Sequence, residues 1–204
     1  MKLKISALAI LFSLINAPVI AAPVVYIDFD GDGLQDTSTS VALGSSVNAS
    51  LYVSNIDLTD GGLISWGTEL SFSSSLLSAS SYSIDSLWPL AGANNGINNS
   101  TGTVDLLASS FAAHTGTIKL ADISFDTLIA GSSILSLDQF NPTSSTFTGF
   151  AAANGVDYDA LIDFSLASAT INVSAVPVPA SIVLFLSGII GLTGFLRKSK
   201  KSQI

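Results

Sequence analysis

Four aspartates stand close together near the start of the chain: Asp28, Asp30, Asp32 and Asp36. Counted from the first of them, they occupy positions 1, 3, 5 and 9 of a segment whose sixth residue is Gly33. This pattern reproduces the first part of a calcium-binding loop, in which carboxylate oxygens surround the ion and the glycine permits a sharp turn. Position 12, which carries a bidentate glutamate in such loops, is Thr39 here. The alternative is an acidic, solvated turn after a strand over Val24–Ile27.

Other residues that support catalysis are sparse. His114 is the only histidine and Glu69 the only glutamate, and no GxSxG, Walker or HExxH motif occurs. We expect His114 to be a solvated loop residue, because its segment is turn-like, and Glu69 to be exposed on the polar face of its strand. A second acidic cluster, Asp157, Asp159 and Asp163, has a spacing that matches no ligand loop. The sequence therefore indicates a protein that is not an enzyme.

Five aromatic residues are candidates for a flat platform that binds sugar rings: Trp66, Trp88, Tyr52, Tyr82 and Tyr158. For Trp66 we expect core packing instead, because its neighbours at a spacing of two residues are mostly apolar. Trp88 lies in a loop-like stretch next to Pro89, and the sequence leaves both an exposed and a buried position open for it.

Charge is distributed unevenly along the chain. All fifteen acidic residues fall between Asp28 and Asp163, and that stretch contains a single Lys or Arg, Lys119. Its formal charge is therefore −14, against −8 for the whole chain. One cation cannot neutralise a row of phosphates, which excludes nucleic-acid binding. The chain has no cysteine, so a domain exported without disulfide bonds must rely on its hydrophobic core.

The N-terminal end has the composition of a targeting segment. Lys2 and Lys4 flank the start of a mostly apolar run from Ile5 to Ile15, and small residues follow as far as Ala21. A basic start, a short apolar run and small residues before the cleavage point are typical of secretion signals. The sequence predicts a signal peptide over residues 1–21.

The C-terminal end predicts a membrane anchor. Ala180–Leu196 is an uncharged, mostly apolar stretch of 17 residues. As a helix it would extend about 25 Å, slightly less than the roughly 30 Å of a hydrocarbon layer. A basic stop follows it and should remain cytoplasmic: Arg197, Lys198, Lys200 and Lys201. We expect an anchor segment over residues 175–204, with a helix at about 180–196 and the basic end at 197–201.

A proline-containing motif precedes this helix: Val176, Pro177, Val178, Pro179 and Ala180. Together with the apolar helix and the basic end, the motif resembles a PEP-CTERM sorting signal, with Val178 in place of the family's usual glutamate. The resemblance implies recognition by an exosortase-type enzyme after export across a bacterial inner membrane. The protein would then be membrane-anchored and periplasmic-facing, or displayed at the cell surface or outside the cell.

Between the two ends, residues 22–174 predict short strands separated by turns. In the clearest run, one face carries Ile64, Trp66, Leu70 and Phe72. The other face of that run carries Ser65, Glu69, Ser71 and Ser73. Similar alternation occurs in Thr117–Phe125, Ser133–Leu137 and Ile162–Val173. Many short strands with little helical pattern predict an all-β domain, an antiparallel β-sandwich of jelly-roll type.

Three pairs of segments, in order, resemble a cohesin-like sandwich of the kind shared with some carbohydrate-binding modules. They are Gly44–Val47 with Leu51–Val53, Glu69–Phe72 with Leu76–Ser78, and Ile123–Phe125 with Ala130–Ser132. The resemblance rests on apolar and turn positions over about Tyr26 to Val173. It implies a binding or adhesion domain and assigns no binding residue.

We therefore expect an exported, anchored or surface-sorted, non-enzymatic protein. Its sandwich would take part in exopolysaccharide or biofilm-matrix interactions through carbohydrate. The alternative is a calcium-stabilised adhesion or cohesin-type protein-binding module, and a glycan-acting hydrolase comes third. The expected partners are an exosortase-type enzyme, the membrane, and polysaccharide or another surface protein, but no nucleic acid.

Removing the C-terminal segment tests the anchor. Deletion of residues 180–204 should release the protein to the periplasm or medium, because the apolar run and its basic stop would be gone. Cell fractionation followed by immunoblotting measures the distribution. If the shortened protein still sediments with the membrane, the anchor lies elsewhere.

Overall fold

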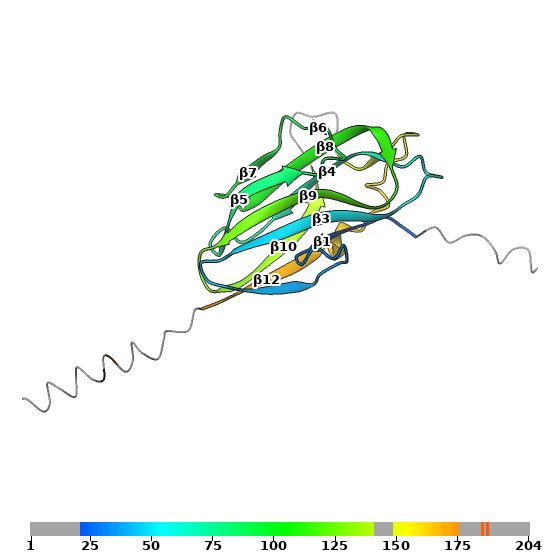
Figure 1. Cartoon of the computed structure of the whole chain (residues 1–204). Coiled ribbons are helices and arrows are strands. Elements are labelled where there is room, and N and C mark those ends of the chain that lie inside the picture. The colour runs from blue at the N-terminus through cyan, green and yellow to red at the C-terminus, as the bar shows by residue number, and fades with distance from the viewer. Residues whose placement is uncertain (1–20, 141–148, 176–184, 186, 188–204) are drawn as a thin grey trace, which may run out of the picture.

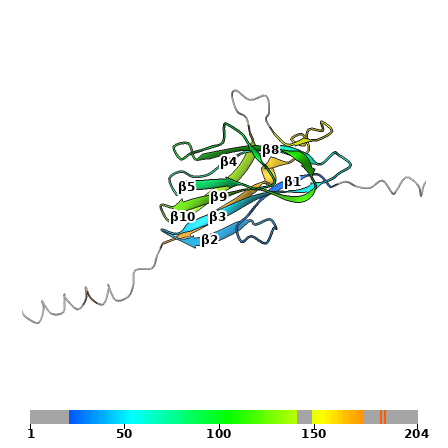
Figure 2. The same ribbon diagram turned by 45° about the horizontal axis from the view of Figure 1, so that its top comes forward.

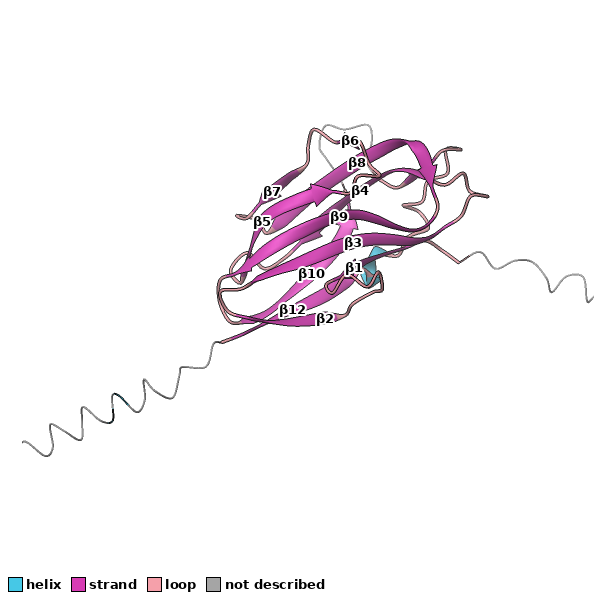
Figure 3. Cartoon of the chain, in the orientation of Figure 1, coloured by secondary structure: helices cyan, strands magenta, loops and turns pink. Residues whose placement is uncertain are grey.

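The computed structural model describes residues 21–140, 149–175, 185 and 187. The first two ranges form β-strands and one 3₁₀ turn, as Figure 3 shows. In chain order these elements are β1 (Val24–Asp28), β2 (Ser38–Ala42), β3 (Ser46–Ile56), β4 (Leu63–Ser71), β5 (Leu77–Ile84), β6 (Leu90–Ala91), β7 (Gly96–Asn98), β8 (Thr103–His114), β9 (Gly116–Thr127), β10 (Gly131–Gln139), β11 (Ala151–Ala152), η1 (Phe164–Leu166) and β12 (Ser168–Ser174).

The strands form two sheets that pack face to face (Figures 1 and 2). The four-stranded sheet has the order β1-β3-β9-β5. The eight-stranded sheet has the order β2-β12-β10-β4-β8-β6, with β11 beside β4 and β7 beside β8. Among the described strands, β2 and β12 form the one parallel pair, and all other pairs are antiparallel. The predicted antiparallel β-sandwich is confirmed, with this parallel pair as an addition.

The chain changes sheets directly after β1. Asp28 ends that strand in the four-stranded sheet, and Ser38 begins β2 at the edge of the eight-stranded sheet. The connecting segment is fastened at its far end, where the Thr170 N–H of β12 donates to the Thr37 carbonyl oxygen at 2.9 Å. The predicted calcium loop therefore links the two sheets.

The core lies between the sheets and extends under the connections. Its largest fully buried side chains are Trp66, Tyr158, Phe125, Phe150, Ile27, Leu51, Leu63, Leu70, Leu77, Leu106, Leu120 and Ile123. Phe72 and Phe125 meet edge to face with ring centroids 5.2 Å apart. Such geometry places the positive edge of one ring against the negative face of the other. With no cysteine in the chain, stability depends on this packing.

Most of the candidate platform aromatics are inside the protein. Trp66 is fully buried, as predicted, and Trp88 is buried too. The indole N–H of Trp88 donates to a backbone carbonyl of β9 at 2.9 Å, which supplies the partner that a buried indole needs. Tyr158 is fully buried. Only Tyr52 and Tyr82 keep exposed surface, so these five residues form no continuous platform.

The prediction of a solvated loop position for His114 is wrong. His114 is the last residue of β8, stands opposite Leu63 and is half-buried. Its ring meets that of Trp88 edge to face at 4.9 Å, and its Nε2 lies 3.1 Å from the Ser110 hydroxyl oxygen. The register shifts between Ser109 and His114, so β8 continues through a bulge. In the sequence, the small residues at the end of β8 and the glycine that follows resemble a turn, and this resemblance led to the wrong prediction.

Ser65 of β4 also differs from its predicted environment. Alternation places it on the polar face, yet it is fully buried. Ala151 of β11 pairs with it, and its hydroxyl lies 3.5 Å from the Gly149 carbonyl oxygen. A segment distant in the sequence therefore covers this part of the outer face.

The predicted signal peptide and sorting segment fall almost entirely outside the described residues. Within the described part of the chain, no helix is both long and apolar enough to cross a membrane. Export and anchoring therefore stay predictions of the sequence.

A matched pair of glycines tests the turn that enters β8. Gly102 has φ +75°, and a Cβ there would collide with the Phe72 carbonyl oxygen; Gly44 has φ +83° with open space around it. Gly44→Ala should lower the free energy of unfolding by about 1–2 kcal/mol, the cost of a left-handed residue. Gly102→Ala should cost about 1–3 kcal/mol more, because the backbone must shift. Denaturant unfolding measures both, and equal losses would contradict this packing.

Candidate functional site

Asp28 organises the loop between β1 and β2. Its carboxylate is fully buried at the end of β1. Oδ1 accepts the N–H groups of Asp30 at 3.0 Å and Gly31 at 2.7 Å, and Oδ2 accepts that of Gly33 at 2.9 Å. Three backbone donors satisfy a charge that would otherwise be costly to bury. The loop is therefore built around this side chain.

Three further hydrogen bonds close the loop onto its own strand. Asp36 Oδ2 accepts the Phe29 N–H at 2.7 Å, and the Asp36 N–H donates to the Ile27 carbonyl oxygen at 2.9 Å. The Tyr26 hydroxyl donates to the Gly33 carbonyl oxygen at 2.6 Å. The first and last aspartates of the predicted motif are consequently brought side by side.

The structure brings three of the four predicted ligands together. Single carboxylate oxygens of Asp28, Asp30 and Asp36 all lie within 4.8 Å of one another. Asp32 stands outside this group, and its Oδ1 accepts the Leu34 N–H at 2.8 Å. Thr39 lies within β2, so the twelfth position belongs to the sheet rather than to the loop. We call Asp28, Asp30 and Asp36 the loop cluster.

A second acidic arrangement spans the outer face of the eight-stranded sheet. Asp138 of β10 stands opposite Glu69 of β4, which in turn stands opposite Asp105 of β8. Directly opposite residues on one face have Cβ atoms about 4.5–5.5 Å apart, so like charges there repel one another. We call Asp138, Glu69 and Asp105 the carboxylate row.

Glu69 is half-buried rather than exposed as predicted. Burial is the largest cause that raises its pKa, followed by the charge of Asp105, the hydrogen bond with Asp105 and the charge of Asp138. Burial also raises the pKa of Asp105, against a hydrogen bond from Glu69 that lowers it. Lys119 is the one Lys or Arg in the described part of the chain, and it pairs with Asp122 on the four-stranded sheet at 2.7 Å. No described lysine or arginine therefore neutralises the row.

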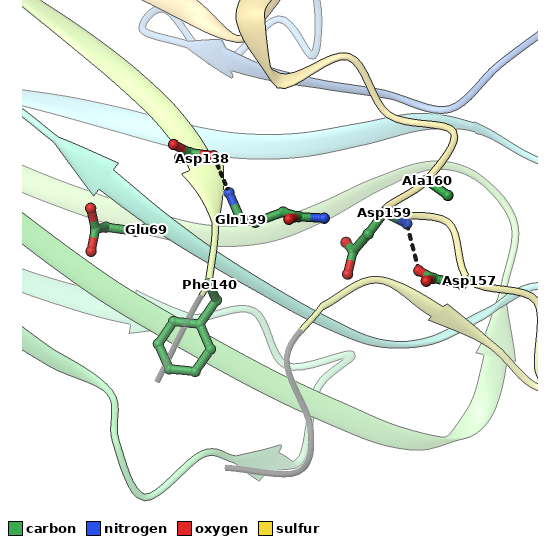
Figure 4. A pocket seen from close by; sticks show the side chains of 7 residues that line it. All are labelled: Glu69, Asp138, Gln139, Phe140, Asp157, Asp159 and Ala160. Carbon is green, nitrogen blue, oxygen red and sulfur yellow. Dashed lines mark hydrogen bonds between the residues drawn. The ribbon is translucent and has the colours of Figure 1, made fainter. Parts of the chain in front are cut away.

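A pocket of about 620 Å³ lies beside the row (Figure 4). The described residues that line it are Glu69, Asp138, Gln139, Phe140, Asp157, Asp159 and Ala160. In Figure 4, Gln139 stands between Glu69 on one side and the two later aspartates on the other. The pocket thus combines two members of the row with part of the second acidic cluster noticed in the sequence. Asp163 is not among its lining residues.

The same sheet presents apolar surface near its β6 edge. A smaller cavity of about 190 Å³ is lined by Leu90, Ala91, Gly92, Leu107, Ala108 and Ser109. Leu90 pairs with Ser109, which stands two residues before Phe111 in β8. The side chain of Leu90 is 43% exposed and that of Phe111 is 89% exposed. An exposed phenylalanine is a typical anchor for a protein partner. We call Leu90 and Phe111 the apolar pair.

The outer face of the four-stranded sheet offers a contrast, because its polar side chains bond one another. The cross-strand hydrogen bonds are Ser46 to Asp126 at 2.7 Å, Ser50 to Asp122 at 2.6 Å, and Ser124 to Asn48 at 2.7 Å. These groups satisfy each other between β3 and β9. The carboxylate row has one hydrogen bond of this kind, from Glu69 to Asp105, and no described lysine or arginine neutralises it.

Sequence reasoning missed the carboxylate row. Asp105 and Asp138 drew no attention, because they come from distant strands and match no motif. The signal that the sequence offered for them was weak: Asp105 and Asp138 each occupy a polar position in their strands, as Glu69 does. Only the pairing of β10, β4 and β8 brings the three together.

Comparison with known proteins gives a fold likeness only. No protein-family model matches the sequence, and no curated protein matches it. Among solved structures, a non-cellulosomal cohesin from Archaeoglobus fulgidus has 13% identity and a TM-score of 0.52, covering 76% of this chain and 92% of the cohesin.

Two further cohesin structures give similar values. A type I cohesin–dockerin complex from Clostridium thermocellum has 8% identity and a TM-score of 0.55, covering 76% of this chain and all of the matched chain. The cohesin module of a Clostridium perfringens family 33 glycoside hydrolase has 16% identity and a TM-score of 0.51, covering 76% and 98%. At these identities the likeness shows the fold alone, and that fold is a cohesin-like β-sandwich.

Proposed function

We propose that this chain is an exported, non-enzymatic module that binds another protein through the outer face of its eight-stranded sheet. The observation that carries the proposal is the carboxylate row. Three like charges stand directly opposite one another without a described lysine or arginine to neutralise them. Such an arrangement costs stability in the free protein. A cationic group from a partner would relieve that cost on binding.

The apolar pair would add binding free energy that is not electrostatic. Phe111 is 89% exposed and Leu90 43%. Burying a side chain of this kind contributes about 1.5–3 kcal/mol. An apolar anchor on the same sheet as charged groups gives both affinity and orientation. The partner we expect therefore presents a Lys- or Arg-rich surface and, further along the same face, an exposed hydrophobic side chain.

Two observations favour protein over polysaccharide as the ligand. Trp66, Trp88 and Tyr158 are buried, which removes most of the candidate sugar platform. Several structurally similar cohesins are recorded in complexes with dockerins, which are proteins. The exopolysaccharide or biofilm role remains the second candidate, supported by the sorting-signal resemblance. Export, anchoring and exosortase recognition belong to the proposal on the same sequence grounds.

We further propose that calcium occupies the loop cluster and stabilises the module. The support is the gathering of Asp28, Asp30 and Asp36 oxygens within 4.8 Å, as hard oxygen ligands suit Ca²⁺. The largest single influence on the Asp30 carboxyl is the hydrogen bond from the Asp32 N–H, which lowers its pKa. Desolvation and the charges of Asp32, Asp36 and Asp28 together outweigh this bond, so the pKa of Asp30 is raised. A cation would relieve this repulsion. The ion would also hold the end of β1 and the loop that leads to the other sheet in one conformation.

Charge removal on the carboxylate row tests the binding face. Purified protein is immobilised and exposed to surface proteins and exopolysaccharide of the source organism, and the retained partner is then purified. Glu69→Gln with Asp138→Asn should raise the Kd for that partner at least about tenfold, equivalent to 1.4 kcal/mol, and added salt should weaken wild-type binding.

The matched control removes equal charge from the opposite sheet. Asp122→Asn with Asp126→Asn should leave the Kd within about twofold. If both double variants weaken binding alike, only net charge matters and the face assignment is wrong. Retention of polysaccharide with no protein would favour the matrix role, and release of soluble sugars would favour the hydrolase.

Calcium titration tests the loop cluster. Binding to the folded state alone stabilises it by about 2.7 kcal/mol at a hundred times Kd. With few carboxylate ligands we expect a Kd of about 10⁻⁴–10⁻³ M, so millimolar Ca²⁺ should raise the melting temperature. Asp30→Asn with Asp36→Asn should abolish that rise.

Asp122→Asn with Asp126→Asn serves again as the control and should keep the calcium response. Mg²⁺ should do much less, because it requires tighter octahedral geometry. A rise that Mg²⁺ reproduces, or that survives loss of Asp30 and Asp36, would mean general screening of the acidic surface.

A further inference from the structure

Asp159 fastens the segment that carries β11. Its Oδ1 accepts the Phe150 N–H at 2.9 Å. Its Oδ2 occupies the space that a side chain at Gly149 would need. The carboxyl group therefore ties the two ends of residues 150–159 together, and glycine is the residue that allows this close approach.

The tied segment covers part of β4. Ala151 pairs with Ser65, and the Ala153 N–H donates to the Gly62 carbonyl oxygen at 3.0 Å. Within the segment, the Tyr158 N–H donates to the Phe150 carbonyl oxygen at 2.9 Å, and both aromatic side chains are fully buried. Release of the segment would expose these rings and uncover Ser65.

The surroundings of Asp159 disfavour its negative charge. Among the described residues, the other titratable groups that line the same pocket are all acidic: Asp157 from its own loop, Glu69 from β4 and Asp138 from β10. Burial is the largest influence and raises the pKa of Asp159 to about 6; the Phe150 N–H lowers it, and the Asp157 charge raises it further. The ionised form thus meets partial desolvation and like charge, with one backbone donor in compensation.

We propose that Asp159 is a pH-sensitive latch: protonated, it holds the β11 segment closed on β4, and ionised, it loosens that segment. The proposal does not depend on which partner the module binds. It predicts local opening, because the sheets themselves are held by the core between them. Opening would also reshape the acidic pocket, which Asp159 lines.

The direction of the effect follows from proton linkage. An aspartate in the opened segment would titrate near its ordinary value of about 3.9, whereas the closed form holds its proton up to about pH 6. Closure is therefore fully favoured below about pH 4 and is weakened as pH rises through 6. A difference of about two units between the pKa values of the closed and opened forms changes the opening constant by about a hundredfold at most. Because solvent reaches part of the group, we expect about a tenfold rise in the opening constant between pH 4.5 and 7.5.

Hydrogen exchange on the whole protein tests the latch. Protection factors of the Tyr158 and Ala153 amides, corrected for intrinsic exchange at each pH, should fall about tenfold from pH 4.5 to 7.5. Amides of β3 and β9 in the four-stranded sheet should change much less. Constant protection of the β11 segment across this range would overturn the proposal.

Variants separate the latch from general acid sensitivity. Asp159→Asn keeps an oxygen that can accept the Phe150 N–H but cannot ionise, so protection should become independent of pH. Asp163→Asn, an exposed carboxylate in the next turn, should retain the wild-type profile. If the Asp159 variant retains the pH dependence, another group is responsible and the latch is wrong.

Discussion

Mutual burial of two sheet faces is the interaction on which every other feature of this domain depends. Trp66, Leu106 and Phe125 are fully buried from opposite sheets, in a chain without cysteine. This packing fixes which side of each strand faces inward and leaves the outer faces to carry polar groups. It also fixes strand neighbours, and only those neighbours place Glu69 between Asp105 and Asp138. The candidate binding surface is thus a consequence of the core.

Open sheets also leave edges, and two asparagines cover parts of them. Asn99 accepts the Ala79 N–H at 2.8 Å and donates to the Ala79 carbonyl oxygen at 3.0 Å, so its amide imitates a neighbouring strand on β5. Asn95 makes the equivalent pair with Leu107 of β8 at 2.6 and 3.0 Å. Exposed edges promote pairing between molecules. Side chains within turn-like segments therefore limit unwanted association while leaving the outer faces free.

Sequence patterns predicted the features that depend on residues close together in the chain, and they missed the features that depend on how distant strands pair. Alternation identified Trp66 as core, and the spacing of the aspartates identified the loop before β2. Burial of Ser65 could not be predicted, because the covering β11 segment comes from far along the chain. The position of His114 was hidden by a bulge, which changes pairing without a clear signature in composition. The carboxylate row was hidden for the same reason, since its members share no motif.

The two acidic arrangements illustrate how one residue type serves different ends. In the loop, buried Asp28 receives three backbone N–H groups, so a sharp turn compensates much of its charge. In the row, the nearby backbone N–H groups already donate to the carbonyl groups of neighbouring strands. Glu69 therefore receives no backbone hydrogen bonds comparable to those of Asp28. Its raised pKa records that difference, with burial and like charge as the causes. Charge compensated by its own backbone, as at Asp28, favours a fixed structure, whereas like charges that meet at Asp30 in the loop and at Glu69 in the row favour an external cation. Under the function proposed above, the loop would therefore serve stability and the row recognition.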